Sequence, residues 1–73
     1  MKIKPGDLIA LDELVNASLF KMPDGFGVDD RTGRIENGEP VLTIAVHNKD
    51  AFVLNGRNQL GWTAMSIMKK VSR

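Results

Sequence analysis

Two features of the 73-residue sequence predict an all-β fold. The second half of the chain contains four short apolar runs separated by turn residues, which is typical of a β-meander. Between residues 5 and 40, glycine, proline, asparagine and aspartate recur so often that a long helix is unfavourable there. Short strands joined by short turns favour a small barrel or a sandwich.

The composition limits the chain to one small domain over residues 1–73. Hydrophobic residues make up 42% of the chain and charged residues 26%, a mixture typical of a folded rather than a disordered protein. Cysteine is absent, which excludes disulfides, thiolate zinc sites and a cysteine nucleophile. Packing of a thin core therefore has to stabilise the fold.

Residues 8–20 allow two interpretations. After a possible N-cap at Asp7, apolar residues recur at helical spacing: Leu8, Leu11, Val15 and Leu19. Residues 8–12 equally fit a short buried strand. We favour the strand because the second half is clearly β; a helix over about 8–20 would make the fold α+β instead.

The later strands are placed by their β-branched residues and by the turns between them. They are expected at residues 41–47, 51–54, 60–64 and 67–72. The turns fall at residues 48–49, at the loop 55–58, and at a tight or 3₁₀ turn at residues 65–66.

These turn lengths predict a strand register. They set Ile44 opposite Val53, and Val53 opposite Leu60. The face expected in the core then holds Leu42, Ile44, Val46, Ala51, Val53, Leu60 and Trp62. The opposite face holds Thr43, Ala45, His47, Phe52, Leu54, Gly61 and Thr63. A slip of one residue would exchange the two faces, so the assignment depends on the turn lengths.

The order of these motifs resembles a known family. Residues 4–9 (KPGDLI), a long first loop, the strand with Gly61 and Trp62, the 65–66 turn and the final strand at residues 69–71 are similar to small five-stranded SH3-like barrels. In particular, the chain resembles stand-alone barrels encoded by tailed bacteriophages, including marine phages. The chain has no tyrosine and one tryptophan, so it departs from the type that binds proline-rich peptides.

The expected outer face carries a candidate protein interface. Phe52 and Leu54 lie there beside Ala45, where a small barrel leaves them exposed or covers them with a loop. Phe20 and Phe26, from the long first loop, are the further candidates. Other apolar residues of this loop could provide the cover: Leu19, Met22 and Val28.

The two termini carry a candidate nucleic-acid contact. Its cations are Lys2, Lys4, Lys69, Lys70 and Arg73. In SH3-like barrels the terminal strands lie close together, so these residues would form one basic stripe able to contact phosphates. Lysines on exposed edge strands also discourage aggregation, which is the simpler explanation. The net charge of +1 gives no further indication of a nucleic-acid partner.

No catalytic, cofactor or metal site is expected. The acids of residues 24–34 lack the spacing of a calcium loop, so this segment is expected to be a solvated loop whose Arg31 or Arg34 pairs with neighbouring acids. His47, the single histidine, has no nucleophile or orienting group beside it in the predicted strand.

The sequence therefore predicts a non-enzymatic binding module that acts on another protein or on itself. Weak, sequence-nonspecific nucleic-acid binding is the alternative. No segment resembles a signal peptide or a membrane span, which predicts a soluble protein without a membrane partner, located in the host cytoplasm or the virion.

Overall fold

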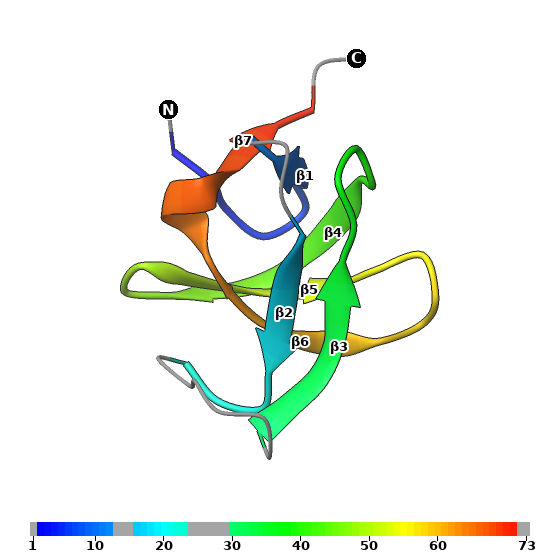
Figure 1. The fold of residues 1–73 in the computed structure, drawn as a ribbon. Coiled ribbons are helices and arrows are strands. Elements are labelled where there is room, and N and C mark those ends of the chain that lie inside the picture. Colours follow the sequence, from blue (N-terminus) through cyan, green and yellow to red (C-terminus); the bar gives the residue numbers. More distant parts are fainter. Residues whose placement is uncertain (1, 13–15, 24–29, 72–73) are drawn as a thin grey trace.

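A computed structural model describes residues 2–12, 16–23 and 30–71. It contains one antiparallel sheet of seven strands and a short 3₁₀ turn (Figure 1). The strands are β1 (Leu8–Leu11), β2 (Ala17–Phe20), β3 (Arg31–Ile35), β4 (Val41–His47), β5 (Asp50–Leu54), β6 (Leu60–Ala64) and β7 (Met68–Lys70). The 3₁₀ turn η2 (Met65–Ile67) joins β6 to β7.

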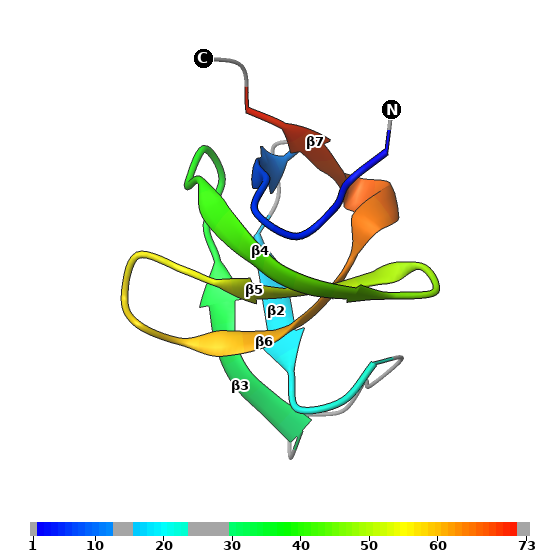
Figure 2. The ribbon, with the colours of Figure 1, turned by 180° about the vertical axis from the view of Figure 1, so that it is seen from behind.

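The strands lie in the order β3-β2-β6-β5-β4-β1-β7. The sheet curls strongly, so that the β2–β3 hairpin crosses the direction of β5 and β6 while β1 and β7 lie together at the other end (Figures 1 and 2). The two end strands, β3 and β7, are not paired with each other, so the sheet does not close.

The all-β prediction is confirmed, and the number of strands is corrected. Residues 8–11 form a strand and residues 17–20 form another, so the alternative of a helix over 8–20 is wrong. The expectation of a long first loop is also wrong, because residues 17–20 and 31–35 of that segment form the strands β2 and β3. The expected 3₁₀ turn at residues 65–66 is confirmed by η2.

The core fills the inner face of the curled sheet. Its buried members come from nearly every strand and are Ile3, Ile9, Leu11, Leu19, Ile35, Val41, Ala51, Val53 and Met68. Strand β1 contributes on both faces, since Ile9, Ala10 and Leu11 are all at most 7% exposed. A continuous apolar run such as LIAL suits a strand that is covered on both sides.

A bulge in β4 changes the predicted register with β5. The tight turn at residues 48–49 and the pairs Ala45 with Phe52 and Val46 with Ala51 are as expected. Beyond them Val53 pairs with Thr43, and Ile44 is the extra, unpaired residue between two pairs. Extra residues of this kind bend a strand and increase its twist.

The loop between β5 and β6 is one residue longer than predicted. Five residues, 55–59, separate Leu54 from its partner Leu60. Asn55, 4% exposed, stabilises this loop: its Oδ1 accepts from the N–H groups of Arg57 and Gln59, both at 2.9 Å. Its Nδ2 donates to the Arg34 carbonyl at 2.9 Å and to Gln59 Oε1 at 2.8 Å.

These two differences overturn much of the predicted core face. Ala51 and Val53 are fully buried as expected. The others are not: Trp62 is half-buried, and the exposed side chains are Leu42 (37%), Val46 (39%), Ile44 (42%) and Leu60 (45%). The extra loop residue moves Gly61 and Thr63 inward and turns Trp62 to the outer face, because strand faces alternate with each residue.

Candidate functional site

Four leucines form a row across the outer face of the sheet. Leu8 pairs with Leu42, Leu42 with Leu54, and Leu54 with Leu60, so the row crosses β1, β4, β5 and β6. Residues directly opposite each other on antiparallel strands share a face and place their Cβ atoms close together. The leucines therefore form one apolar strip on the side of the sheet opposite Val53.

A second, aromatic row runs beside the leucine row. Ala45 pairs with Phe52, Phe52 with Trp62, and Trp62 with Phe20 on β2. Both rows lie on the same face because Phe52 and Leu54 are two residues apart on β5. We call the eight residues of the two rows the outer patch.

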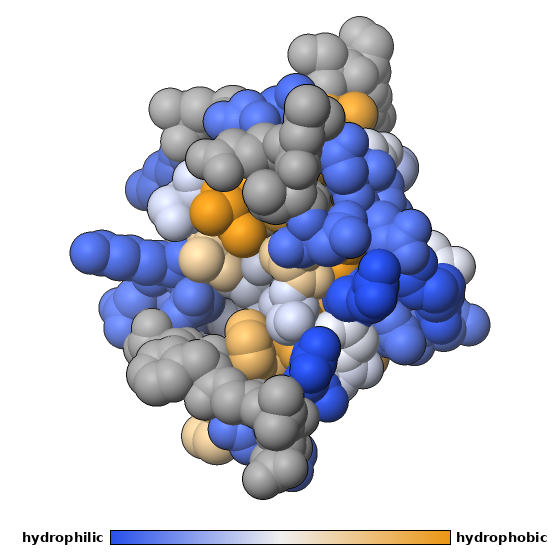
Figure 3. Space-filling model, viewed as in Figure 1, coloured by the Kyte–Doolittle hydropathy of each residue, from blue (hydrophilic) through white to orange (hydrophobic). Residues whose placement is uncertain are grey.

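Partial exposure distinguishes the outer patch from the core. Leu42 and Leu60 are 37% and 45% exposed, and the other six members are half-buried. Ile44, the unpaired bulge residue next to Ala45, is 42% exposed at the border of the patch. Hydrophobic residues also reach the surface between hydrophilic ones on the side of the molecule drawn in Figure 3.

Trp62 lies at the centre of the aromatic row. Its ring centroid is 5.2 Å from that of Phe52, with the planes inclined by 44°. His47, at the end of β4, meets Trp62 edge-on, with centroids 6.4 Å apart and an angle of 77°. Both separations fall within the range in which aromatic rings attract each other. The rings therefore form a contiguous half-exposed cluster.

The structure brings together four of the five predicted interface residues. Ala45, Phe52 and Leu54 share the outer face as expected, and Phe20 joins them from β2. Phe26 lies outside the described residues.

Two of the three loop residues expected to cover the outer face, Leu19 and Met22, lie within the described part of the chain. Leu19 is buried in the core instead, and Met22 is 63% exposed. Val28 lies outside the described part of the chain.

Sequence reasoning missed Trp62 and the leucines at positions 8, 42 and 60. Residues 41–46 are apolar except for Thr43, so apolar residues occupy both faces of β4 and hydrophobicity alone does not decide which face is inward. The deciding feature is the length of the 55–59 loop, which the hydrogen bonds between Asn55 and Gln59 close at five residues and which the sequence alone does not determine.

The predicted basic stripe is partly assembled. Strands β1 and β7 are paired, which brings the lysines of β7 to the end of the sheet where the chain begins. Lys69 is exposed, but Lys70 forms an ion pair with Asp7 at 3.4 Å. The Lys4 N–H and the Lys70 side chain lower the pKa of Asp7 below its ordinary value of 3.8. Arg73 lies outside the described residues.

A polar cluster joins the β3–β4 turn to the 55–59 loop. Glu39 accepts the N–H groups of Glu36 and Gly56, each at 3.0 Å, and pairs with Arg57 at 3.3 Å. Partial burial acts to raise the pKa of Glu39, but these hydrogen bonds and the Arg57 charge outweigh it and the pKa is lowered. Arg34 pairs with Glu36 at 3.6 Å, which confirms that an arginine of residues 24–34 bonds to a neighbouring acid.

Two further features are absent from the described residues. Residues 2–12, 16–23 and 30–71 contain no group of three or more histidine and acidic side chains placed to hold a metal ion. In the same part of the chain, no helix has the length and apolar character needed to cross a membrane.

Comparison with protein-family models, with curated proteins and with solved structures gives no match to this chain.

Proposed function

We propose that the chain is an SH3-like barrel that functions as a binding module, through association of its outer patch with a second copy of itself. The SH3-like assignment is supported by the five strands expected from the sequence, which are adjacent in the sheet in the order β6-β5-β4-β1-β7. The β2–β3 hairpin takes the place of the long first loop, and η2 precedes the last strand as the resemblance requires.

The observation that carries the binding proposal is the pair of apolar rows on the outer face. A contiguous exposed apolar patch on a small domain marks an interaction surface more often than single exposed residues do. Tryptophan and phenylalanine are also enriched at the centres of protein interfaces. Trp62 and Phe52 are central here, and the exposed leucines at positions 42 and 60 border them.

A second copy is the partner that suits this surface best. None of the eight residues of the outer patch is charged, and the whole chain carries a net charge of only +1. Like-charge repulsion therefore opposes face-to-face packing of two copies very little. Two sheets pack face to face readily, and a two-fold axis would let each leucine row meet the aromatic row of the other copy.

Sedimentation velocity over a range of concentrations tests this proposal. We expect the wild type to shift from monomer to dimer as its concentration rises. Leu60→Lys places a charge in the leucine row at a position that is already 45% exposed, so it should prevent dimer formation without unfolding the chain. Circular dichroism would verify the fold of this variant.

Ser66→Lys is the matched control, because Ser66 is exposed in η2 and belongs to neither row. It adds the same charge and should dimerise like the wild type. A wild type that stays monomeric at every concentration would rule out self-association and leave a different protein as the partner. A dimer that persists in Leu60→Lys would assign the interface to another face.

Sequence-nonspecific nucleic-acid binding is the second candidate. The β1–β7 pairing favours it by placing Lys69 and Lys70 at one end of the sheet. Asp7, which pairs with Lys70 and accepts the Lys4 N–H, lies at the same end. Phosphate contacts weaken steeply with salt. We therefore expect any binding of a labelled single strand to be strongest at low salt and to be reduced by Lys69→Glu. No binding at low salt would exclude this function.

A further inference from the structure

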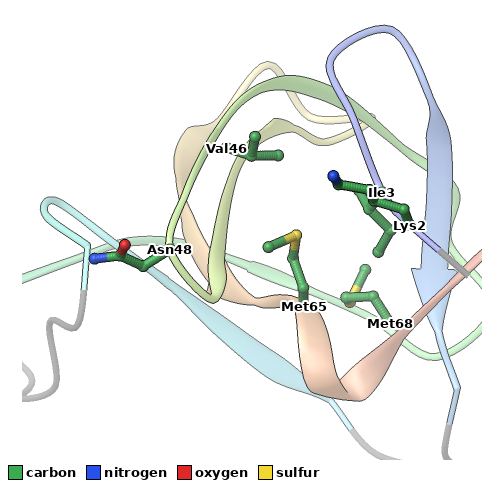
Figure 4. A pocket seen from close by; sticks show the side chains of 6 residues that line it. All are labelled: Lys2, Ile3, Val46, Asn48, Met65 and Met68. Atoms are coloured by element: carbon green, nitrogen blue, oxygen red, sulfur yellow. The ribbon is translucent and has the colours of Figure 1, made fainter.

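A pocket opens at the end of the molecule away from the 55–59 loop. It has a volume of about 260 Å³ and is lined by Lys2, Ile3, Val46, Asn48, Met65 and Met68 (Figure 4). The N-terminal segment, the end of the β4–β5 hairpin, η2 and β7 surround it. Val46 pairs with the fully buried Ala51 and so faces away from the outer patch, which makes the two surfaces separate.

The pocket walls are aliphatic and adaptable. Ile3 and Met68 belong to the buried core at 8% and 4% exposure, so the pocket reaches down to it. Met65 and Val46 form the opposite wall (Figure 4). Methionine side chains are flexible and polarisable, and they suit apolar ligands of variable shape. At about 260 Å³ the pocket is just below the usual range for drug-sized ligands, so its occupant is small.

Among the described residues that line the pocket, Lys2 carries the one charged side chain. The Lys2 side chain runs beside Ile3 and its nitrogen is turned toward the middle of the pocket, whereas the Asn48 amide points away from it (Figure 4). None of the six lining residues is acidic. Among the described residues, Lys2 forms no ion pair, in contrast to Lys70, which is paired with Asp7. An aliphatic wall below one unpaired ammonium group complements an apolar tail that ends in an anion.

We propose that this pocket binds a small aliphatic carboxylate, a short- or medium-chain fatty acid, with the tail between Met65 and Met68 and the carboxylate at Lys2. The tail would remove apolar side-chain surface from water, and the carboxylate would accept a charge-assisted hydrogen bond from the ammonium group. The site is independent of the proposed self-association.

An NMR titration of the intact chain with sodium octanoate, below its micelle-forming concentration, tests the proposal. The methionine methyl signals are the readout, because Met65 and Met68 line the pocket while Met22 is 63% exposed and does not line it. We expect saturable shifts of the Met65 and Met68 methyl groups and little change at Met22. The Leu60→Lys variant should bind octanoate as the wild type does.

Removal of the charge at Lys2, compared with removal of the same charge at Lys4, identifies the role of Lys2. Lys2→Gln should bind octanoate roughly fivefold more weakly, since an accessible ion pair contributes up to about that factor. Lys4→Gln removes the same charge from the same segment but not from the pocket lining, and it should bind unchanged. Octanol has no anionic group, so it should bind the wild type about as weakly as octanoate binds the Lys2→Gln variant. Octylammonium carries a positive charge, so it should bind the wild type more weakly than octanol does. Shifts that do not saturate, or equal affinities for octanoate and octanol, would overturn the proposal.

Discussion

Phe52 and Trp62 face each other directly across β5 and β6, with their ring centroids 5.2 Å apart. The two rings lie on the outer face of strands whose inner face carries the fully buried Ala51 and Val53. They therefore pack outside the main core, and their contribution to stability can be measured separately from it.

A double-mutant cycle should detect this ring contact. Phe52→Leu and Trp62→Leu, alone and together, should give a coupling free energy of about 0.5–1.5 kcal/mol. Urea denaturation at a fixed low protein concentration provides the free energies, because dimer formation would otherwise add a concentration-dependent term. The pair Leu54 and Leu60, opposite each other without rings, serves as the comparison. Coupling of zero for the aromatic pair would mean that the rings do not attract each other.

Thr43→Val should stabilise the protein. Thr43 is 1% exposed, and its Oγ1 has no hydrogen-bond partner among the described residues. A buried hydroxyl without a partner costs free energy, and valine replaces it with a methyl group of similar shape. We expect a gain of about 1 kcal/mol in the free energy of unfolding, seen as a higher denaturation midpoint.

Thr43→Ser distinguishes the contribution of the Thr43 hydroxyl group from that of its methyl group. Serine keeps the hydroxyl and loses the buried methyl group, so its stability should fall by about 1 kcal/mol. A loss of stability in Thr43→Val instead would show that the hydroxyl is hydrogen-bonded in the native state.

Gly61→Ala should destabilise the fold at the crossing of β2 and β6. An added Cβ would lie 2.5 Å from the Leu19 Cβ and would also overlap Thr32 Oγ1. Leu19 is fully buried, so its Cβ cannot move aside freely, and overpacking of this kind costs about 1–3 kcal/mol. Gly56→Ala is the control, because its added Cβ would approach only a Glu39 carboxylate oxygen, at 3.3 Å. Thermal midpoints of the two variants should differ clearly, and equal midpoints would contradict the close packing.

Glu39 should make stability depend on pH in the acid range. Its folded-state pKa is lowered below the ordinary value of 4.5, so ionised Glu39 favours the folded state. This contribution is complete above pH 4.5 and is lost as the pH falls through the lower folded-state pKa.

Comparison with Glu39→Gln isolates this dependence. The variant should be less stable than the wild type by about 1 kcal/mol near neutral pH, because a charged acceptor for two N–H groups is lost. Chemical denaturation at a series of pH values should show the difference shrinking below pH 4.5. A difference that stays constant down to strongly acidic pH would contradict the role of the carboxylate.

The sequence predicted those parts of the fold that depend on local residue preferences. The β-branched run of residues 41–47, the tight turn at residues 48–49 and the 3₁₀ turn at residues 65–66 all occur as expected. Left-handed backbone at Asn48, with φ of 54°, is a conformation that asparagine tolerates well, which is why the turn could be recognised.

The faces of the strands could not be predicted in the same way, because they depend on counting residues across loops and bulges. Ile44 looks like a core residue by composition, yet it is unpaired and exposed. Trp62 is a large aromatic residue and is expected to face inward, but one extra residue in the 55–59 loop places its side chain on the outer face. Part of the candidate interface was still predicted correctly. Ala45 lies between the Ile44 bulge and the 48–49 turn, and Phe52 and Leu54 lie between that turn and the 55–59 loop, so neither change alters their face.

The β2–β3 hairpin could not be inferred from pattern either. Its strands contain residues such as Ser18, Thr32 and Gly33 that resemble a loop by composition. Tertiary contacts supply what local preference lacks: Leu19 is buried against Gly61, and the Thr32 hydroxyl donates to the Leu60 carbonyl at 2.6 Å.

The bulge at Ile44 also has a genetic consequence. Loss of its single codon would make Thr43 and Ala45 neighbours, and these two residues already pair with Val53 and Phe52, which are themselves neighbours. Every side chain of β4 would then keep its present side of the sheet, while the local bend would be removed. The bend of β4 therefore depends on the single codon for Ile44, and the other codons of the strand determine which side chains face inward.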